Sequence, residues 1–138
     1  MKRYEQFPHT ADIGVRAYGK DLKELFENAA FAMFDIIADL EELSGDTVEH
    51  FELEADSREE LLVSWLDELL YNFYTKQLIF YEFHVEELTE NRLKAKAMAR
   101  PVGANRNRLK TEIKAATYSD LNIKKSEGRF EVEIIFDV

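Results

Sequence analysis

Two short stretches far apart in the chain carry the residues best suited to chemistry. In residues 9–17, HTADIGVRA, His9 and Asp12 stand three positions apart at the start of a strand pattern. In the second stretch, Asp137 precedes Val138, so a carboxylate stands beside a main-chain or terminal oxygen. Such oxygens are the ligands that hard divalent cations take in proteins. We therefore expect Asp12, Asp137 and Val138 to form one metal site, provided that the fold brings the two stretches together.

The sequence contains no cysteine, which limits both the metal and the nucleophile that it can use. A thiolate zinc site, a disulfide framework and a cysteine nucleophile are all excluded. Oxygen ligands favour Ca²⁺, Mg²⁺ or Mn²⁺ over zinc. Of these we expect Ca²⁺ as the bound ion, with Mg²⁺ and Mn²⁺ as the alternatives.

His9 and Asp12 each have more than one interpretation. His9 can ligate a metal, donate to Asp12, or pack its ring under the N-terminal turn, and composition alone favours the structural role. Asp12 can instead cap main-chain N–H groups in a turn beside Gly14. His50 and His84 lie in strand patterns without spaced partners, and we assign them no function.

The composition is that of a globular protein. The chain has 138 residues, of which 46% are hydrophobic and 12% aromatic, enough for one domain over residues 1–138 with a sizeable core. The absence of cysteine favours a reducing compartment. No long apolar run typical of a signal peptide or a membrane span is visible. We expect a cytoplasmic protein that has no membrane partner.

Charge is distributed unevenly along the chain. The formal net charge is −10, which argues against direct binding of nucleic acid because phosphate contacts draw on clustered Lys and Arg. Residues 92–129 nevertheless hold eleven basic residues and three acidic ones, which leaves −18 for the remainder. This segment either forms ordinary solvated strand faces or orients the protein on a charged partner.

Two amphipathic helices are predicted from capping signals and apolar spacing. Asp21 followed by Glu24 begins a stripe typical of a helix over residues 21–38. Ser57 with Glu60 marks the start of a second helix, over residues 58–76. Its stripe of leucines and aromatic residues, with Trp65 among them, indicates core packing.

Period-two alternation predicts strands in the rest of the chain. A hairpin over residues 120–136 is expected because Gly128 can supply the positive φ of a tight reversal. The composition of residues 101–108 predicts an exposed loop. The fold class is therefore α+β, with two amphipathic helices packed on a mainly antiparallel β-sheet. The inward-facing sets are Phe51, Leu53 and Ala55; Ile79, Tyr81, Phe83 and Val85; Leu93, Ala95, Ala97 and Ala99; and Phe130, Val132, Ile134 and Phe136, with Asp137 on the opposite face.

Five ordered blocks carry a resemblance that runs from end to end. They are HTADIGVRAYG at 9–19, LKELFENAAFAMFDII at 22–37, LLVSWLDELLYNF at 61–73, IKAATYSDLNI at 113–123 and EIIFDV at 133–138. In order and spacing the chain resembles the archease family, the small accessory proteins of the RtcB-type tRNA-splicing RNA ligase.

The resemblance implies an activator and not an independent enzyme. Archeases promote guanylylation of the ligase histidine and multiple turnover in tRNA splicing, in a system that uses GTP and a divalent metal, so tRNA is reached only through the ligase. The family's metal positions carry over onto Asp12, Asp137 and Val138. Lys114 matches a lysine associated with activity. We expect His9 to have a supporting role in the same activation of the partner. Ser119 stands where many relatives have histidine, which argues against a histidine ligand there.

Two other classes of function remain open. A stand-alone metal-dependent hydrolase would use His9 as general base with Asp12 and Asp137 as metal ligands. A general chaperone or RNA-binding adaptor would act through residues 92–129. The acidic remainder of the chain and the lack of an aromatic-rich RNA motif make the adaptor the weaker rival.

Overall fold

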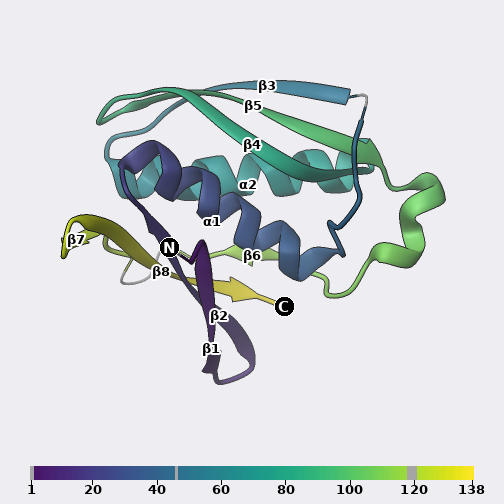
Figure 1. Cartoon of the computed structure of the whole chain (residues 1–138), viewed down its shortest axis with the longest axis horizontal. Coiled ribbons are helices and arrows are strands. Elements are labelled where there is room, and N and C mark those ends of the chain that lie inside the picture. The colour runs from purple at the N-terminus through teal and green to yellow at the C-terminus, as the bar shows by residue number, and fades with distance from the viewer. Residues whose placement is uncertain (1, 46, 118–120) are drawn as a thin grey trace.

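The computed structural model describes residues 2–45, 47–117 and 121–138, and Figure 1 shows their arrangement. Over these residues two sheets enclose a pair of helices. The elements in chain order are β1 (Tyr4–His9), β2 (Asp12–Gly19), α1 (Leu22–Ile37), β3 (Thr47–Glu54), α2 (Arg58–Lys76), β4 (Leu78–Leu88), β5 (Arg92–Pro101), the 3₁₀ helix η1 (Gly103–Arg108), β6 (Ala115–Ala116), β7 (Lys124–Ser126) and β8 (Arg129–Asp137).

The strands form one five-stranded and one three-stranded sheet. The larger sheet has the order β1-β2-β8-β6, with β7 also paired to β8, and the smaller has the order β3-β5-β4. Every described strand pair is antiparallel. Both helices lie between the two sheets (Figure 1). The predicted α+β class is confirmed, with helices covered by a sheet on each side and not by a single sheet.

Local capping explains where the helices begin. The Asp21 carboxylate accepts a 2.8 Å hydrogen bond from the Glu24 N–H, and the Ser57 hydroxyl accepts one of 3.2 Å from the Glu60 N–H. Each bond satisfies an N–H group that the first helical turn leaves without a partner. The predicted helices are therefore confirmed, and the first is shorter by one residue at each end because Asp21 and Ala38 are its caps.

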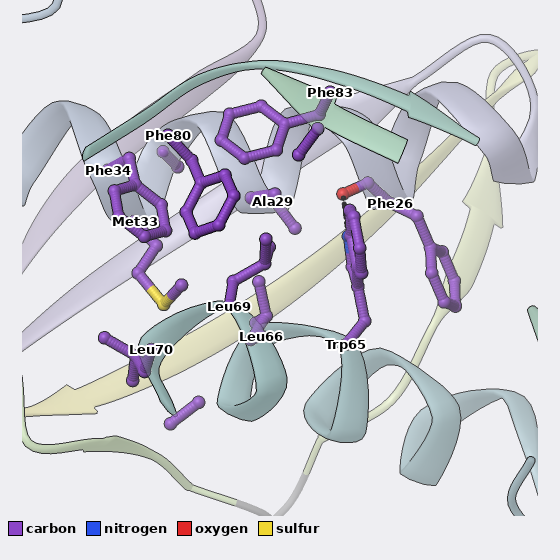
Figure 2. Packing of buried hydrophobic residues seen from close by; sticks show 14 of the residues in the cluster. Phe26, Ala29, Met33, Phe34, Trp65, Leu66, Leu69, Leu70, Phe80 and Phe83 are labelled. Atoms are coloured by element: carbon purple, nitrogen blue, oxygen red, sulfur yellow. Dashed lines mark hydrogen bonds between the residues drawn. The ribbon is translucent and has the colours of Figure 1, made fainter. Parts of the chain in front are cut away.

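The core fills the space between the two sheets. Trp65 is fully buried on α2, and its indole N–H donates a 3.1 Å hydrogen bond to the Phe26 carbonyl of α1 (Figure 2). Phe34 of α1 packs edge-on against Phe80 of β4, with ring centroids 5.5 Å apart. The same buried cluster includes Val15 of β2 and Val132 of β8, so it ties the helices to both sheets. Each buried large side chain in it contributes about 1.5–3 kcal/mol. No helix of the described residues is long and apolar enough to cross a bilayer.

Two local features differ from the strand and loop predictions. The register shifts between Phe80 and Glu82, so Tyr81 has no partner on β5 and leaves the predicted inward row, while Phe80 enters the core. Residues 101–108 are largely exposed, as predicted, but residues 103–108 form the 3₁₀ helix η1 and Val102 is buried. The Val102 N–H donates a 2.8 Å hydrogen bond to the Gln77 carbonyl.

The predicted reversal before β8 is confirmed. Ser126 pairs with Arg129, and the two residues between them, Glu127 and Gly128, have φ values of 53° and 78°. Positive φ at both central positions is the geometry of a type I′ hairpin turn. The first strand of the hairpin begins at Lys124, and residue 120 of the predicted range lies outside the described residues.

Candidate functional site

The register of β2 and β8 brings the two chemically suited stretches together. Ile13 pairs with Phe136, and the next position outward on each strand is Asp12 on β2 and Asp137 on β8. In an antiparallel pair such opposite residues project from the same face. The Asp137 residue is exposed and Asp12 is partly exposed, so two carboxylates are available at the same end of neighbouring strands.

His9 lies beside Asp12 across a two-residue turn. The two residues pair in the register of β1 and β2, and Ala11 in the turn has a φ of 62°. His9 Nδ1 is 3.7 Å from Asp12 Oδ2, and the side chains are 45% and 31% exposed. This separation is within ion-pair range and too long for a hydrogen bond. His9 is therefore an electrostatic neighbour of Asp12 when the imidazole is protonated.

Lys114 reaches the same end of the sheet from the start of β6. Its main-chain N–H donates a 2.7 Å hydrogen bond to the main-chain oxygen of Asp137, and Ala115 pairs with Asp137 in the register. The Lys114 residue is exposed, and Val138 directly follows β8 with 37% exposure. We name Asp12, Asp137, Val138, Lys114 and His9 together the strand-end site.

The donors of the strand-end site suit a hard cation. Asp12 and Asp137 offer carboxylate oxygens and Val138 offers a main-chain oxygen, which are ligands that Ca²⁺, Mg²⁺ and Mn²⁺ accept. Among residues 2–45, 47–117 and 121–138, no three His, Asp or Glu side chains gather closely enough to form a metal cluster by themselves. The predicted donor set is thus two carboxylates and main-chain oxygen, without a third acidic or imidazole ligand in place.

The outward face next to the site is stiffened by packing. The Phe7 ring of β1 covers Gly14 of β2, so closely that a Cβ at Gly14 would overlap it. Arg16 on β2 makes an ion pair with Glu133 on β8, in which Nε lies 3.0 Å from Oε2. These contacts hold the β1–β2 hairpin against β8. The role of Phe7 was not predicted from the sequence, although a glycine inside a strand pattern signals a close approach.

Two side chains of α2 that were not selected from the sequence contact the segment that carries Lys114. The Asp67 carboxylate accepts a hydrogen bond from the Ala116 main chain; burial raises the pKa of Asp67, and this bond partly opposes the rise. The Tyr74 hydroxyl donates a 2.7 Å hydrogen bond to the Ile113 carbonyl. Burial, with a smaller contribution from the charge of Glu112, raises the pKa of Tyr74. Both residues therefore contact the segment that carries Lys114 from the side of the sheet that α2 covers.

On the three-stranded sheet, basic residues of the segment 92–129 lie next to acidic ones. Lys94 of β5 lies between Glu52 of β3 and Glu87 of β4 in the register, and Arg92 Nε is 3.7 Å from Glu54 Oε1. The positive charge that is concentrated in the sequence is therefore interleaved with acidic residues on the three-stranded sheet.

These features define a class of protein: an α+β fold with two antiparallel sheets around a helix pair and an oxygen-rich site where two strands end. The solution structure of Methanobacterium thermoautotrophicum Protein 1598 has this fold, with a TM-score of 0.81 and 32% identity over 100% of both chains. A Thermotoga maritima crystal structure, described as an archease and possible chaperone, shares the fold with a TM-score of 0.68 at 17% identity over 97% of this chain and 96% of the other.

Sequence comparison places the chain in a family. The archease of Methanosarcina mazei is 41% identical over 141 residues, which cover 99% of this chain and 97% of that protein. The profile of the Archease protein family matches residues 4–138. The chain belongs to the Archease protein family.

Proposed function

We propose that this chain is an accessory activator of an RtcB-type tRNA-splicing RNA ligase. In this role it promotes guanylylation of the ligase histidine and multiple turnover, while the covalent chemistry stays with the ligase. The observation that carries the proposal is the register of β2 and β8, which places Asp12 and Asp137 one position beyond the Ile13–Phe136 pair, with the Lys114 N–H bonded to the Asp137 oxygen. The strand-end site has complementary charges and exposed groups, as a surface that enters a partner's nucleotide pocket requires.

The donor set supports a role for a divalent cation. Asp12 and Asp137 would hold it through carboxylate oxygens and Val138 through its main-chain oxygen, with Ca²⁺ expected first and Mg²⁺ or Mn²⁺ as alternatives. When bound, such an ion supplies positive charge that can offset the charge of a triphosphate. Because Ca²⁺ takes six to eight oxygen ligands, water or groups of the ligase would complete the coordination. The strand-end site would then bind the ion most tightly in the complex.

Lys114 adds a second source of positive charge. The main-chain N–H of Lys114 is hydrogen-bonded to the Asp137 oxygen, and Lys114 is exposed to solvent. An ammonium group held at a defined position can stabilise charge that develops on phosphate oxygens during transfer. His9, whose Nδ1 is 3.7 Å from Asp12 Oδ2, would act on that carboxylate through its charge when the imidazole is protonated, and it is not required as a ligand.

The distribution of charge favours the activator over an RNA-binding adaptor. Binding of RNA through residues 92–129 would need basic side chains that are free to meet phosphates. Lys94 and Arg92 of β5 instead face acidic residues on β3 and β4. A stand-alone hydrolase is distinguished by experiment, because it would turn over nucleotide or phosphoester without any partner and would lose this turnover on chelation.

The test is a guanylylation assay with the matching ligase, run with and without this protein and across Ca²⁺, Mg²⁺ and Mn²⁺. Asp12→Ala and Asp137→Ala should abolish stimulation while circular dichroism shows an intact fold. Glu52→Ala is the matched control, because it removes an exposed carboxylate from the other sheet. Full stimulation by either site variant would contradict the proposal, as would turnover by this protein alone.

A further inference from the structure

The short segment 113–117 is bonded to β8 through its main chain. The Lys114 N–H donates to the Asp137 oxygen at 2.7 Å, and the Thr117 N–H donates to the Ile135 oxygen at 3.0 Å. Strand β6 itself has two residues, which are too few to hold a stable strand position through pairing alone. The position of Lys114 therefore depends on what else holds this segment.

Helix α2 holds the same segment from the other side. The Tyr74 hydroxyl donates to the Ile113 carbonyl at 2.7 Å, and the Ala116 main chain donates to the Asp67 carboxylate. In Figure 1, β6 runs below the helix layer beside β8, consistent with these contacts. The two bonds bracket Lys114, one before it and one after it.

The spacing of the two α2 residues suits this arrangement. Asp67 and Tyr74 are seven positions apart, which places them on one face of the helix two turns from each other. Ile113 and Ala116 are buried, whereas Lys114 is exposed. The bonds from α2 thus hold the buried residues of the segment inward and leave Lys114 outward.

We propose that Asp67 and Tyr74 are positioning residues that hold Lys114 and the end of β8 in the geometry that the strand-end site requires. This inference rests on the proposed function for its consequence, because neither residue would touch the partner or the metal. Its structural part, that α2 fixes Lys114, stands independently of any partner.

Single-atom variants test the contact with Tyr74. Tyr74→Phe removes the hydroxyl that bonds Ile113 and leaves the ring in place. Tyr71→Phe is the matched control, because Tyr71 lies one turn earlier on α2 and is 62% exposed. Amide hydrogen exchange should show the Lys114 N–H exchanging about three- to tenfold faster in Tyr74→Phe, the effect expected when one hydrogen bond is lost. Tyr71→Phe should leave this rate unchanged.

A second pair of variants separates hydrogen bonding from charge at Asp67. Asp67→Ala removes the acceptor and should speed exchange of the Ala116 and Lys114 amides. Asp67→Asn retains an oxygen acceptor without the charge and should restore slow exchange. Urea unfolding of each variant checks that the protein as a whole remains folded, so that faster exchange reports local opening.

The ligase assay then tests the functional consequence. At saturating concentration of this protein, Tyr74→Phe and Asp67→Ala should lower the maximal rate of guanylylation several-fold, with recovery in Asp67→Asn. Unchanged exchange in both variants would overturn the structural part. Faster exchange with full maximal stimulation would overturn the positioning role. Full stimulation by Lys114→Ala would contradict the role that the proposed function gives to Lys114. The exchange result would then still support the contact between α2 and the segment 113–117.

Discussion

The main-chain N–H of Lys114 donates a 2.7 Å hydrogen bond to the main-chain oxygen of Asp137. This bond fixes a basic and an acidic residue at one end of the five-stranded sheet, although they are 23 positions apart. Ala115 of β6 pairs with Asp137 of β8, Asp12 and Asp137 each lie one position beyond the Ile13–Phe136 pair of β2 and β8, and His9 of β1 pairs with Asp12, so four strands contribute to one site. The site therefore has its geometry set by main-chain pairing, while its side chains remain accessible.

Lys114→Met should lower ligase stimulation without changing stability. The Lys114 residue is exposed, so the free energy of unfolding should change by no more than about 0.5 kcal/mol. The positive charge offered to the nucleotide would be lost, whereas Lys114→Arg should retain part of the stimulation. Guanylylation rates and urea unfolding measure the two effects. Lys110→Met, an exposed lysine four positions earlier, is the control, and an equal loss in both would show that only general charge matters.

The effect of Asp137→Asn on the stability of the protein should have opposite signs in metal-free buffer and in buffer that contains Ca²⁺. Two carboxylates that face each other across strands repel, so without metal the variant should be more stable by about 0.2–1 kcal/mol. With excess Ca²⁺ the wild-type protein gains stability by mass action and the variant gains less. Melting temperatures with chelator and with Ca²⁺ measure the difference.

Asp12→Asn should behave in the same way in this experiment, because Asp12 is the other half of the pair. Glu131→Gln on β8 is the control for charge, since it lies on the same face six positions from Asp137. If Ca²⁺ stabilises both Asp variants as strongly as the wild-type protein, the ion binds elsewhere or does not bind in the absence of the ligase.

The helices and the individual strands could be predicted from the sequence because their signals are local. Asp21 and Ser57 cap their helices through N–H groups only three residues away. Alternation likewise indicated that Val132, Ile134 and Phe136 face the core. The displacement of Tyr81 was not predicted, since the register shift after Phe80 depends on pairing with β5.

The arrangement of the strand-end site required pairing between distant parts of the chain. Periodicity identifies which face of β2 and β8 is buried, but it does not say that these strands are neighbours. Asp12 and Asp137 were selected by their chemistry and by family resemblance, and only the register sets them opposite each other. The contact of Asp67 with the segment 113–117 was not predicted. An acidic residue in a helix pattern is usually exposed, and the sequence does not indicate which distant segment will pack against it.

Gly128→Ala and Gly103→Ala should differ in the sign of their effect on stability. A Cβ added at either glycine would meet no atom within 4 Å, so both substitutions have space, but Gly128 has a φ of 78°. A left-handed conformation costs an alanine about 1–2 kcal/mol. Gly103 has no positive φ, so alanine there should be neutral or stabilising by about 0.4–1 kcal/mol, because it restricts the unfolded chain. Urea unfolding measures both, and equal effects would contradict the assigned type I′ turn.

Glu27→Gln should reduce the dependence of stability on pH. Burial raises the pKa of Glu27 on α1 above 4.5, and the 2.8 Å hydrogen bond from the Val85 N–H of β4 partly opposes this rise. The folded protein therefore takes up a proton at higher pH than the unfolded chain does. Stability from this group is present at low pH and is lost as pH rises from 4.5 through the raised folded pKa.

The side-chain amide of the Glu27→Gln variant would keep an oxygen acceptor for Val85 and carry no charge to desolvate. Near pH 7.5 the variant should therefore be at least as stable as the wild-type protein, and its advantage should shrink toward pH 4.5. Urea unfolding across this range measures the effect, with Glu52→Gln as the exposed control on β3. Every other titrating group is common to both proteins. If their curves of unfolding free energy against pH were parallel, Glu27 would ionise as freely in the folded protein as in the unfolded chain, and the prediction would be wrong.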